Sequence, residues 1–406
     1  MGEAFAFRDP RAGAPPPPLS SREERTLATA VEAVRRGDAA AARKALGTQR
    51  RKGAPEPEPL SLAAAYLALA EGRLDEARSA LASLTAANPT WLAAVEAAAD
   101  LAAAEGRTLD ALERYQAVLR LSPSDRRARA RADSLRKEVA VAKGREAEEA
   151  LAAGNLDAAR RAAHSLLQLE PASASGYLLL SRAAAAGGGN EDAWTWASEA
   201  RRKAPNDRSV AAFAAGIAEK AGRWADAASL YEGLAAADLA FGRKAEEARL
   251  EFRIQNLPET ARRAVESPRL TRAELASLLW WTVPEVREAL VPPGVGIAVD
   301  VVDRPDRVAL VKAIGLGFLA VSPETHRVGT DAPVVRTDLA TTLRRVAVLA
   351  GRGRAPAGCL APDPPSERIL SECGILPGSP SRNVTGREAL RALDKAARLG
   401  REGGTR

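Results

Sequence analysis

The sequence is poor in the residues that most often build catalytic and metal sites. Its 406 residues include two histidines, two cysteines and one methionine, and 4% are aromatic. Neither histidine has a second ligand at metal spacing, and no phosphate-binding loop or nucleophile arrangement stands out. No apolar run reaches the roughly 18 to 20 residues that cross a bilayer. We therefore predict no enzyme activity, cofactor, metal or membrane span, and the net charge of +7 favours acidic partners.

What the sequence does contain is a repeat of 34 residues. Its repeated segments are GRLDEA (72–77), GRTLDA (106–111), GNLDAA (154–159), GGNEDA (188–193) and GRWADA (222–227), with an earlier unit around Gly37. A proline follows four of these glycines by 17 residues, as Pro89 follows Gly72. Glycine ends a helix without strain, and proline stops the next one. A repeat of this length indicates stacked units, so we predict an all-α array of about six helical hairpins over residues 23–256.

This pattern resembles the tetratricopeptide repeat (TPR) family over roughly residues 23–240. The resemblance implies an α-solenoid that binds a protein or peptide along a groove built by the first helix of each hairpin. Positions three and six before the glycines face that groove in the family. They nominate Tyr66, Leu69, Asp100, Glu148, Leu151 and Arg182, with Glu96 nearby. The Lys/Asn clamp for a C-terminal carboxylate is missing at the corresponding places, so we do not predict that ligand.

One interval breaks the repeat. Gly106 and Gly154 are 48 residues apart, and most of the extra residues lie in the basic segment SDRRARARADSLRK (124–137). Good helix formers without glycine or proline predict an extended helix between two blocks of hairpins. Clustered arginines can neutralise phosphates, but no aromatic residues interleave for base stacking. A charge run on a helix is usually a solvated face, so we do not predict a nucleic-acid partner.

The repeat ends near residue 268, where three related phrases follow. They are SPRLTRAELASLLWW (267–281), APVVRTDLATTLRRV (332–346) and SRNVTGREALRALDKAA (381–397). Each joins a polar turn to an amphipathic helix. Thr271 with Glu274, and Thr385 with Glu388, have the spacing of a capping box. An N-terminal cap contributes about 0.5 to 2 kcal/mol, so helix capping alone explains these acidic residues.

These phrases also resemble the S-layer homology (SLH) domain, and we assign residues 257–399 to it. LTRAE (270–274) matches the family's Thr-Arg-Ala-Glu motif, VRTD (335–338) matches in part, and VTGRE (384–388) has Gly386 in place of the arginine. The resemblance implies a helical bundle that binds cell-wall polysaccharide and anchors the protein to the bacterial envelope. It puts Thr271, Arg272 and Glu274 in one glycan groove and Arg336 and Asp338 in a second, with Arg387 one step late in the third.

The compartment stays open at this stage. The SLH resemblance implies the periplasm or the cell surface, but the opening residues lack the pattern of a signal peptide, so a cytoplasmic location is the alternative. Cys359 and Cys373 could close a disulfide worth about 3 kcal/mol in an oxidising compartment, or stay reduced in the cytosol. Residues 1–22 contain four consecutive prolines and are predicted to be a disordered lead-in, and residues 400–406 a disordered tail.

Together these features predict a non-enzymatic scaffold in two parts. The hairpin array holds a protein partner, and the SLH-like bundle tethers the chain to the cell envelope. The alternative is a cytosolic adaptor in protein complex assembly, in which the SLH-like part serves protein contacts only.

Overall fold

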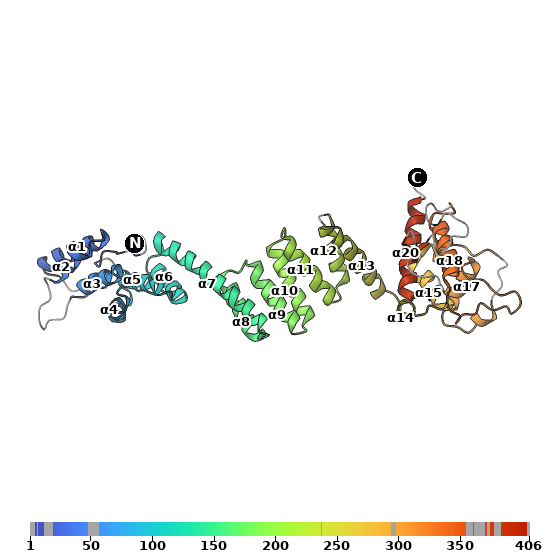
Figure 1. Cartoon of the computed structure of the whole chain (residues 1–406), viewed down its shortest axis with the longest axis horizontal. Coiled ribbons are helices and arrows are strands. Elements are labelled where there is room, and N and C mark those ends of the chain that lie inside the picture. The colour runs from blue at the N-terminus through green and yellow to red at the C-terminus, as the bar shows by residue number, and fades with distance from the viewer. Residues whose placement is uncertain are drawn as a thin grey trace. The chain divides into compact units, whose positions relative to one another are not determined.

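A computed structural model describes residues 5, 7–11, 19–47, 57–236, 238–293, 298–354, 360, 370–371, 374–376 and 383–403. Within these ranges the regular structure is helical, apart from one isolated β-bridge between Thr271 and Pro333. The predicted all-α class of stacked, TPR-like helical hairpins is confirmed (Figure 1). The chain divides into two compact units, residues 1–222 and 223–406.

The unit boundary lies at residue 222, whereas the sequence placed it at 256. Helices α12 (Trp224–Ala235) and α13 (Leu239–Gln255) pack against each other. Leu250 and Ile254 of α13 also belong to the hydrophobic core of the second unit. Apolar contact therefore assigns these helices to the second unit, although the 34-residue repeat continues into α12.

In the described part of the first unit, five complete helical hairpins are followed by α11 (Figure 1). Its helices are α1 (Ser21–Arg35), α2 (Ala39–Gly47), α3 (Glu58–Ala70), α4 (Leu74–Ala87), α5 (Leu92–Ala104), α6 (Thr108–Leu121), α7 (Arg126–Ala152), α8 (Leu156–Leu169), α9 (Ala174–Ala186), α10 (Asn190–Lys203) and α11 (Arg208–Lys220). The repeated glycines stand at the hairpin turns, as predicted: Gly72 has φ 74° and Gly154 has φ 73°. After Gly72, the Arg73 N–H donates to the Ala68 carbonyl at 2.9 Å and closes the end of α3.

Alanine and leucine side chains form several small cores along the first unit. The helix predicted for the basic insertion is confirmed as α7, which has 27 residues. Ala128, Ala132 and Leu135 of α7 pack into the core around α5 and α6, while Ala140 and Ala147 pack into the next core with α8 and α9. This single helix thus joins a first block of hairpins (α1–α6) to a second block (α7–α10).

The described residues of the predicted lead-in make tertiary contacts, which differs from the expectation of disorder. Phe7 is 9% exposed and belongs to the core of the first block. The Arg35 Nε donates to the Phe7 carbonyl at 2.9 Å. α1 starts at Ser21, with a complete capping box between Ser20 and Glu23. Burial of an aromatic side chain is favourable whatever the proline content nearby. The prediction of disorder rested on the prolines and did not take Phe7 into account.

The second unit has one hydrophobic core built by short helices. Besides α12 and α13 they are α14 (Glu259–Glu266), α15 (Arg272–Thr282), α16 (Pro284–Glu288), the 3-10 turn η1 (Val299–Val301), α17 (Arg307–Gly315), α18 (Arg336–Ala350) and α20 (Gly386–Gly403). α15 contributes Leu275, Leu278 and Leu279 to this core, and all three are fully buried. No helix among the described residues combines the length and apolar character that spanning a bilayer requires.

The three related phrases meet at one place in this unit. The Leu270 N–H donates to the Val384 carbonyl at 2.9 Å, and the Val334 N–H donates to the Leu270 carbonyl at 2.8 Å. All three side chains are buried. The starts of α15, α18 and α20 therefore converge, so the sequence similarity of the phrases corresponds to a shared structural position.

Candidate functional site

Four of the predicted groove residues lie together in the first block. Tyr66 and Leu69 on α3 and Glu96 and Asp100 on α5 form what we call the first-block groove, together with Asp125 at the start of α7. The four predicted residues are only 1 to 4% exposed. Phe5 and residues 7–11 of the same chain, which we call the N-terminal segment, contribute to this burial, since Phe5 and Phe7 lie against these four residues.

Aromatic and polar contacts hold the N-terminal segment in this groove. The ring of Phe7 meets the ring of Tyr66 edge to face, with centroids 5.4 Å apart. The Arg8 Nε donates to Glu96 Oε2 at 2.6 Å, and its Nη2 pairs with Asp125. The indole Nε1 of Trp91 donates to the Pro10 carbonyl at 2.9 Å. The segment is therefore fixed by side chains from α3, from α5 and from the start of α7.

A second arginine balances the buried carboxylates beneath the segment. Arg127 of α7 donates to Glu96 Oε1 at 2.8 Å and to Asp100 Oδ1 at 2.9 Å. The Tyr115 hydroxyl also donates to Asp100. Burial, together with the charge of Asp100, raises the pKa of Tyr115, so this hydroxyl stays protonated and remains a donor. Arg127 of the basic insertion thus supplies a counterion to the groove, whereas Arg126 and Arg129 of the same insertion are exposed.

The Tyr66 hydroxyl differs from that of Tyr115. Burial and the nearby charges of Glu96 and Asp100 raise the pKa of Tyr66, so its hydroxyl also keeps its proton. Within the described residues it is buried and has no hydrogen-bond partner. A buried hydrogen-bond donor without a partner costs about 1 to 3 kcal/mol. The hydrogen bonding of the groove is therefore incomplete at Tyr66 when the N-terminal segment occupies it.

The other predicted groove residues lie in the second block, where α7 and α9 border an open cleft. This second-block cleft has a volume of about 330 Å³, with Ala140, Leu166 and Leu179 as its floor and Arg145, Glu148 and Arg182 among the charged groups of its rim. Val141 lines it and is 57% exposed. Leu151 does not line the cleft but packs against the core that contains its floor residues. The guanidinium of Arg182 lies 5.7 Å from the ring centre of Phe213.

The structure does not separate the predicted glycan residues into independent grooves. Thr271 and Glu274 form the expected capping box, since each accepts a hydrogen bond from the other's backbone N–H. Arg272 donates to the Val328 carbonyl at 2.6 Å and pairs with Asp338 at 3.3 Å. The resemblance placed Arg272 and Asp338 in different grooves, whereas the structure pairs them because the starts of α15 and α18 converge.

Arg336 and Arg387 occupy environments that the resemblance did not imply. Arg336 is 2% exposed, and its Nη1 lies 3.5 Å from the Leu376 carbonyl, so it faces the interior. Arg387 pairs with Glu251 of α13. Gly386 replaces the motif arginine for a packing reason: a Cβ there would come within 1.8 Å of the Ala264 carbonyl oxygen.

Asp300 has a structural role that differs from the helix cap its sequence position suggests. Its carboxylate accepts from the backbone N–H groups of Val328, Gly329 and Thr330 at 2.8 to 3.3 Å. Burial alone would raise the pKa of Asp300, but these three donors hold it below its usual range. Asp300 therefore fixes the loop that also receives Arg272. Its signal in the sequence, an aspartate before a helix, predicts a helix cap more readily than a loop clamp.

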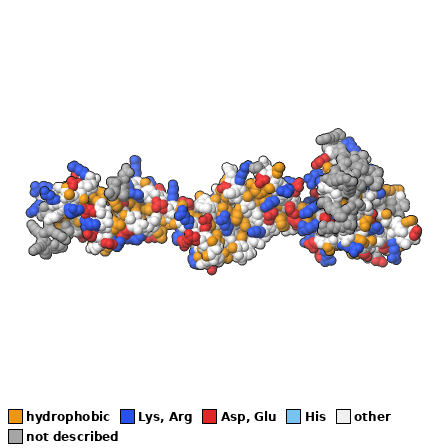
Figure 2. All heavy atoms as spheres, viewed as in Figure 1, with side chains coloured by type: hydrophobic (Ala, Val, Ile, Leu, Met, Phe, Trp, Pro, Cys, Tyr) orange, Lys and Arg blue, Asp and Glu red, His pale blue; other side chains and the backbone are white. Residues whose placement is uncertain are grey.

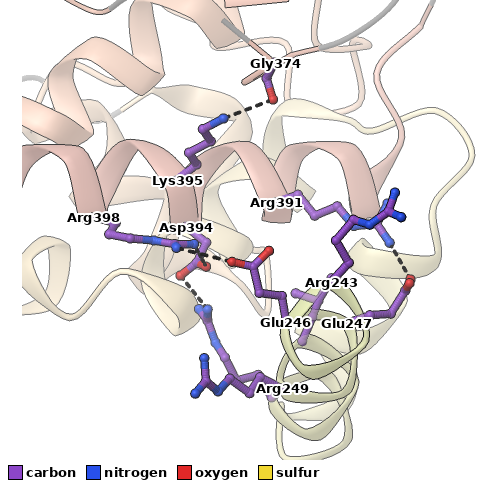
Figure 3. Close-up of a pocket in the computed structure, with 11 residues that line it drawn as sticks. Arg243, Glu246, Glu247, Arg249, Gly374, Arg391, Asp394, Lys395 and Arg398 are labelled. Atoms are coloured by element: carbon purple, nitrogen blue, oxygen red, sulfur yellow. Dashed lines mark hydrogen bonds and ion pairs between the residues drawn. The ribbon is translucent and has the colours of Figure 1, made fainter. Parts of the chain in front are cut away.

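A charged cleft of about 730 Å³ lies between α13 and α20 (Figure 3). Several of its cations are paired: Arg391 with Glu247 at 2.9 Å, and Arg253 with Asp394 at 2.5 Å. Arg243 is exposed at its edge. Six Lys or Arg against three Asp or Glu line the cleft, so it is basic. On the face drawn in Figure 2, by contrast, positive and negative side chains are interspersed over both units.

Cys359 and Cys373 lie outside the described residues. Among the residues that the structure does describe, no group of His, Cys, Asp or Glu has the arrangement of a metal site.

Comparison with known proteins adds the following. No protein-family model matches the sequence, and no curated protein does either. Solved structures that match include a tetratricopeptide repeat protein from Parabacteroides merdae (18% identity, 57% of this chain and 91% of that chain, TM-score 0.25). Another is the TPR2AB domain of yeast Sti1 in complex with pHSP90 (16%, 56% and 99%, TM-score 0.29). A third is PilW, a type IV pilus biogenesis factor (14%, 56% and 99%, TM-score 0.25).

These matches give no support to an SLH domain. At such low TM-scores the TPR-like assignment rests on the chain's own hairpins and their glycine turns.

Proposed function

We propose that this chain is a non-catalytic scaffold that binds an extended peptide segment of a partner protein along the first helices of its hairpins. The observation that carries the proposal is the second-block cleft. There α7 and α9, the first helices of consecutive hairpins, combine an apolar floor with a charged rim. An apolar centre with a polar edge is the usual anatomy of a protein-binding surface.

Substitution of Val141, the exposed valine that lines this cleft, tests the proposed peptide binding most sharply. Peptides would be selected from a random displayed library against the whole chain, and their affinity measured by fluorescence anisotropy. Val141→Glu should weaken their binding by at least about tenfold, because it puts a charge on the apolar floor. Leu109→Glu is the matched control, since Leu109 is similarly exposed, at 51%, but lies on α6, outside the cleft. Failure to select any peptide, or equal affinity for both variants, would refute the proposal.

Tethering to the cell envelope is a second candidate, for the C-terminal unit. What supports it is the convergence of three related helix starts at Leu270, Val334 and Val384. The internal contacts of Arg272 and Arg336 weigh against these two residues as the glycan ligands. Exposed cations for an anionic polysaccharide lie in the cleft between α13 and α20. A cell-surface or periplasmic location belongs to this candidate, and a cytoplasmic adaptor is its alternative.

Binding to purified cell-wall sacculi distinguishes envelope tethering from the cytoplasmic adaptor. Tethering predicts salt-sensitive retention that falls in Arg243→Glu, with Arg201→Glu on the exposed face of α10 as the control. If the wild-type chain is not retained, the C-terminal unit serves protein contacts only.

A further inference from the structure

The N-terminal segment lies in the first-block groove in the way a bound peptide would. Its contacts join residues far apart in the sequence, 88 positions for Arg8 with Glu96 and 81 positions for Pro10 with Trp91. Residues 7–9 have no regular structure and residues 10 and 11 form a turn, so the polar contacts are made by an irregular stretch. The groove therefore has at least one occupant whose chemistry can be read directly.

We infer that residues 7–10 are a resident ligand of the first-block groove, and that this groove binds partner segments in which an arginine directly follows an aromatic residue. A partner segment of this kind must displace the chain's own. The inference deepens the proposed function and rests on it, since it names the ligand class and the regulation of one of the two grooves.

Two adjacent subsites give the groove this preference. Tyr66 offers its ring to the aromatic residue, and edge-to-face pairs are favourable beyond their buried area. Glu96 and Asp125 accept from different nitrogens of one guanidinium, Nε and Nη2. A lysine has a single ammonium and cannot present this fork. The site should therefore prefer arginine to lysine, although both carry the same charge.

The resident segment can leave without stranding buried charges. When Arg8 departs, Glu96 keeps its hydrogen bond from Arg127, and Asp125 keeps its cap on the Ala128 N–H at 2.9 Å. Arg8 itself has a side chain that is 28% exposed, so its desolvation is partial. The hairpins should therefore stay folded when Arg8 leaves the groove.

The Tyr66 hydroxyl indicates that the resident fits imperfectly. It is buried in the groove without a hydrogen-bond partner among the described residues, directly beside Phe7. A partner segment with a hydrogen-bond acceptor at this point would accept from the Tyr66 hydroxyl and would bind more tightly than the resident segment. This is the property expected of a segment that occupies a site until a better ligand arrives.

The test uses a chain lacking residues 1–11 and a fluorescent peptide of residues 5–11, FAFRDPR, with anisotropy as the readout. The truncated chain keeps the Ser20 capping box, and its helix content is to be checked by circular dichroism. We expect it to bind the peptide at least about tenfold more tightly than the whole chain, in which the tethered segment competes at high effective concentration. Whole-chain Arg8→Ala should also bind the peptide better than wild type, which tests the inference even if the truncation fails to fold.

Variant peptides test the ligand class. Arg8→Ala and Phe7→Ala should each weaken binding by about tenfold or more, and Arg8→Lys by less. Asp9→Asn should leave it unchanged, because the carboxylate of Asp9 forms its ion pair with Arg11 of the same segment. The inference is wrong if neither the truncated chain nor the whole-chain Arg8→Ala variant binds the peptide better than wild type. It is also wrong if all variant peptides bind equally. Val141-dependent peptide binding would then still stand, so the two failures are distinguishable.

Discussion

The first-block groove and the second-block cleft are built by the same repeat but differ in charge burial and occupancy. In the first block, Glu96 and Asp100 are 1% and 4% exposed and lie beneath Phe7 and Arg8. In the second block, the corresponding groove position Glu148 is exposed beside an open cleft. The repeat thus sets where a groove lies, while the side chains that line it decide what fills it.

The two regions also differ in their electrostatic cost. Buried carboxylates need partners, and the first block supplies two arginines, Arg8 and Arg127. An exposed glutamate is solvated by water and needs none. The filled groove should therefore be sensitive to loss of charge, and the open cleft should not.

The largest expected effect is on stability. Glu96→Ala removes the acceptor shared by Arg8 and Arg127, and should lower the free energy of unfolding by about 2 to 3 kcal/mol. Glu148→Ala is the matched change in the open cleft and should stay within about 0.5 kcal/mol. Urea unfolding followed by circular dichroism measures both. Equal losses would remove the electrostatic distinction between the blocks.

Substitutions at the turns should show where the blocks are alike. Gly72 and Gly154 have nearly the same positive φ, and a Cβ would meet nothing within 4 Å at either. Alanine at each should therefore cost about 1 kcal/mol through backbone strain alone. Thermal unfolding measures the two costs, and a large difference would show that the turns are not equivalent. As a control, Gly144→Ala inside α7 should stabilise by about 0.5 to 1 kcal/mol.

A smaller, pH-dependent effect is expected on the docking of the N-terminal segment in the first block. Burial would raise the pKa of Asp125, but the Ala128 N–H and Arg8 hold it below its usual range. A carboxyl with a lowered folded pKa contributes stability above its unfolded pKa of about 3.9, and loses it as pH falls through the folded pKa. Docking of the N-terminal segment should therefore be constant from neutral pH to about pH 5 and weaken below about pH 4. Protection of the Arg8–Asp9 bond against limited proteolysis by an acid-active protease measures this, and docking that strengthens in acid would contradict it.

Much of the first unit could be predicted because its signals are local and repeated. A glycine with positive φ, small residues at helix contacts and a following proline each have one structural meaning, and their spacing gave the hairpins and α7. The capping boxes at Thr271 and Thr385 were predictable for the same reason.

The contents of the grooves could not be predicted because they depend on contacts distant in sequence. Nothing local indicates that Arg8 meets Glu96 or that Arg272 meets Asp338. One signal for a buried N-terminal segment was present in the sequence. Two of the six phenylalanines of the chain are Phe5 and Phe7, in a segment that was predicted to be disordered because of its prolines. An aromatic pair in a chain so poor in aromatics indicates burial.

The indole N–H signal of Trp91 in a nitrogen-15 NMR spectrum tests the central claim most directly. In the whole chain this N–H donates to the Pro10 carbonyl, and Trp91→Phe identifies its signal. We predict that the signal shifts when residues 1–11 are removed and returns towards its original position when the peptide of residues 5–11 is added. An identical Trp91 signal in the whole and the truncated chain would show that the segment does not occupy the groove.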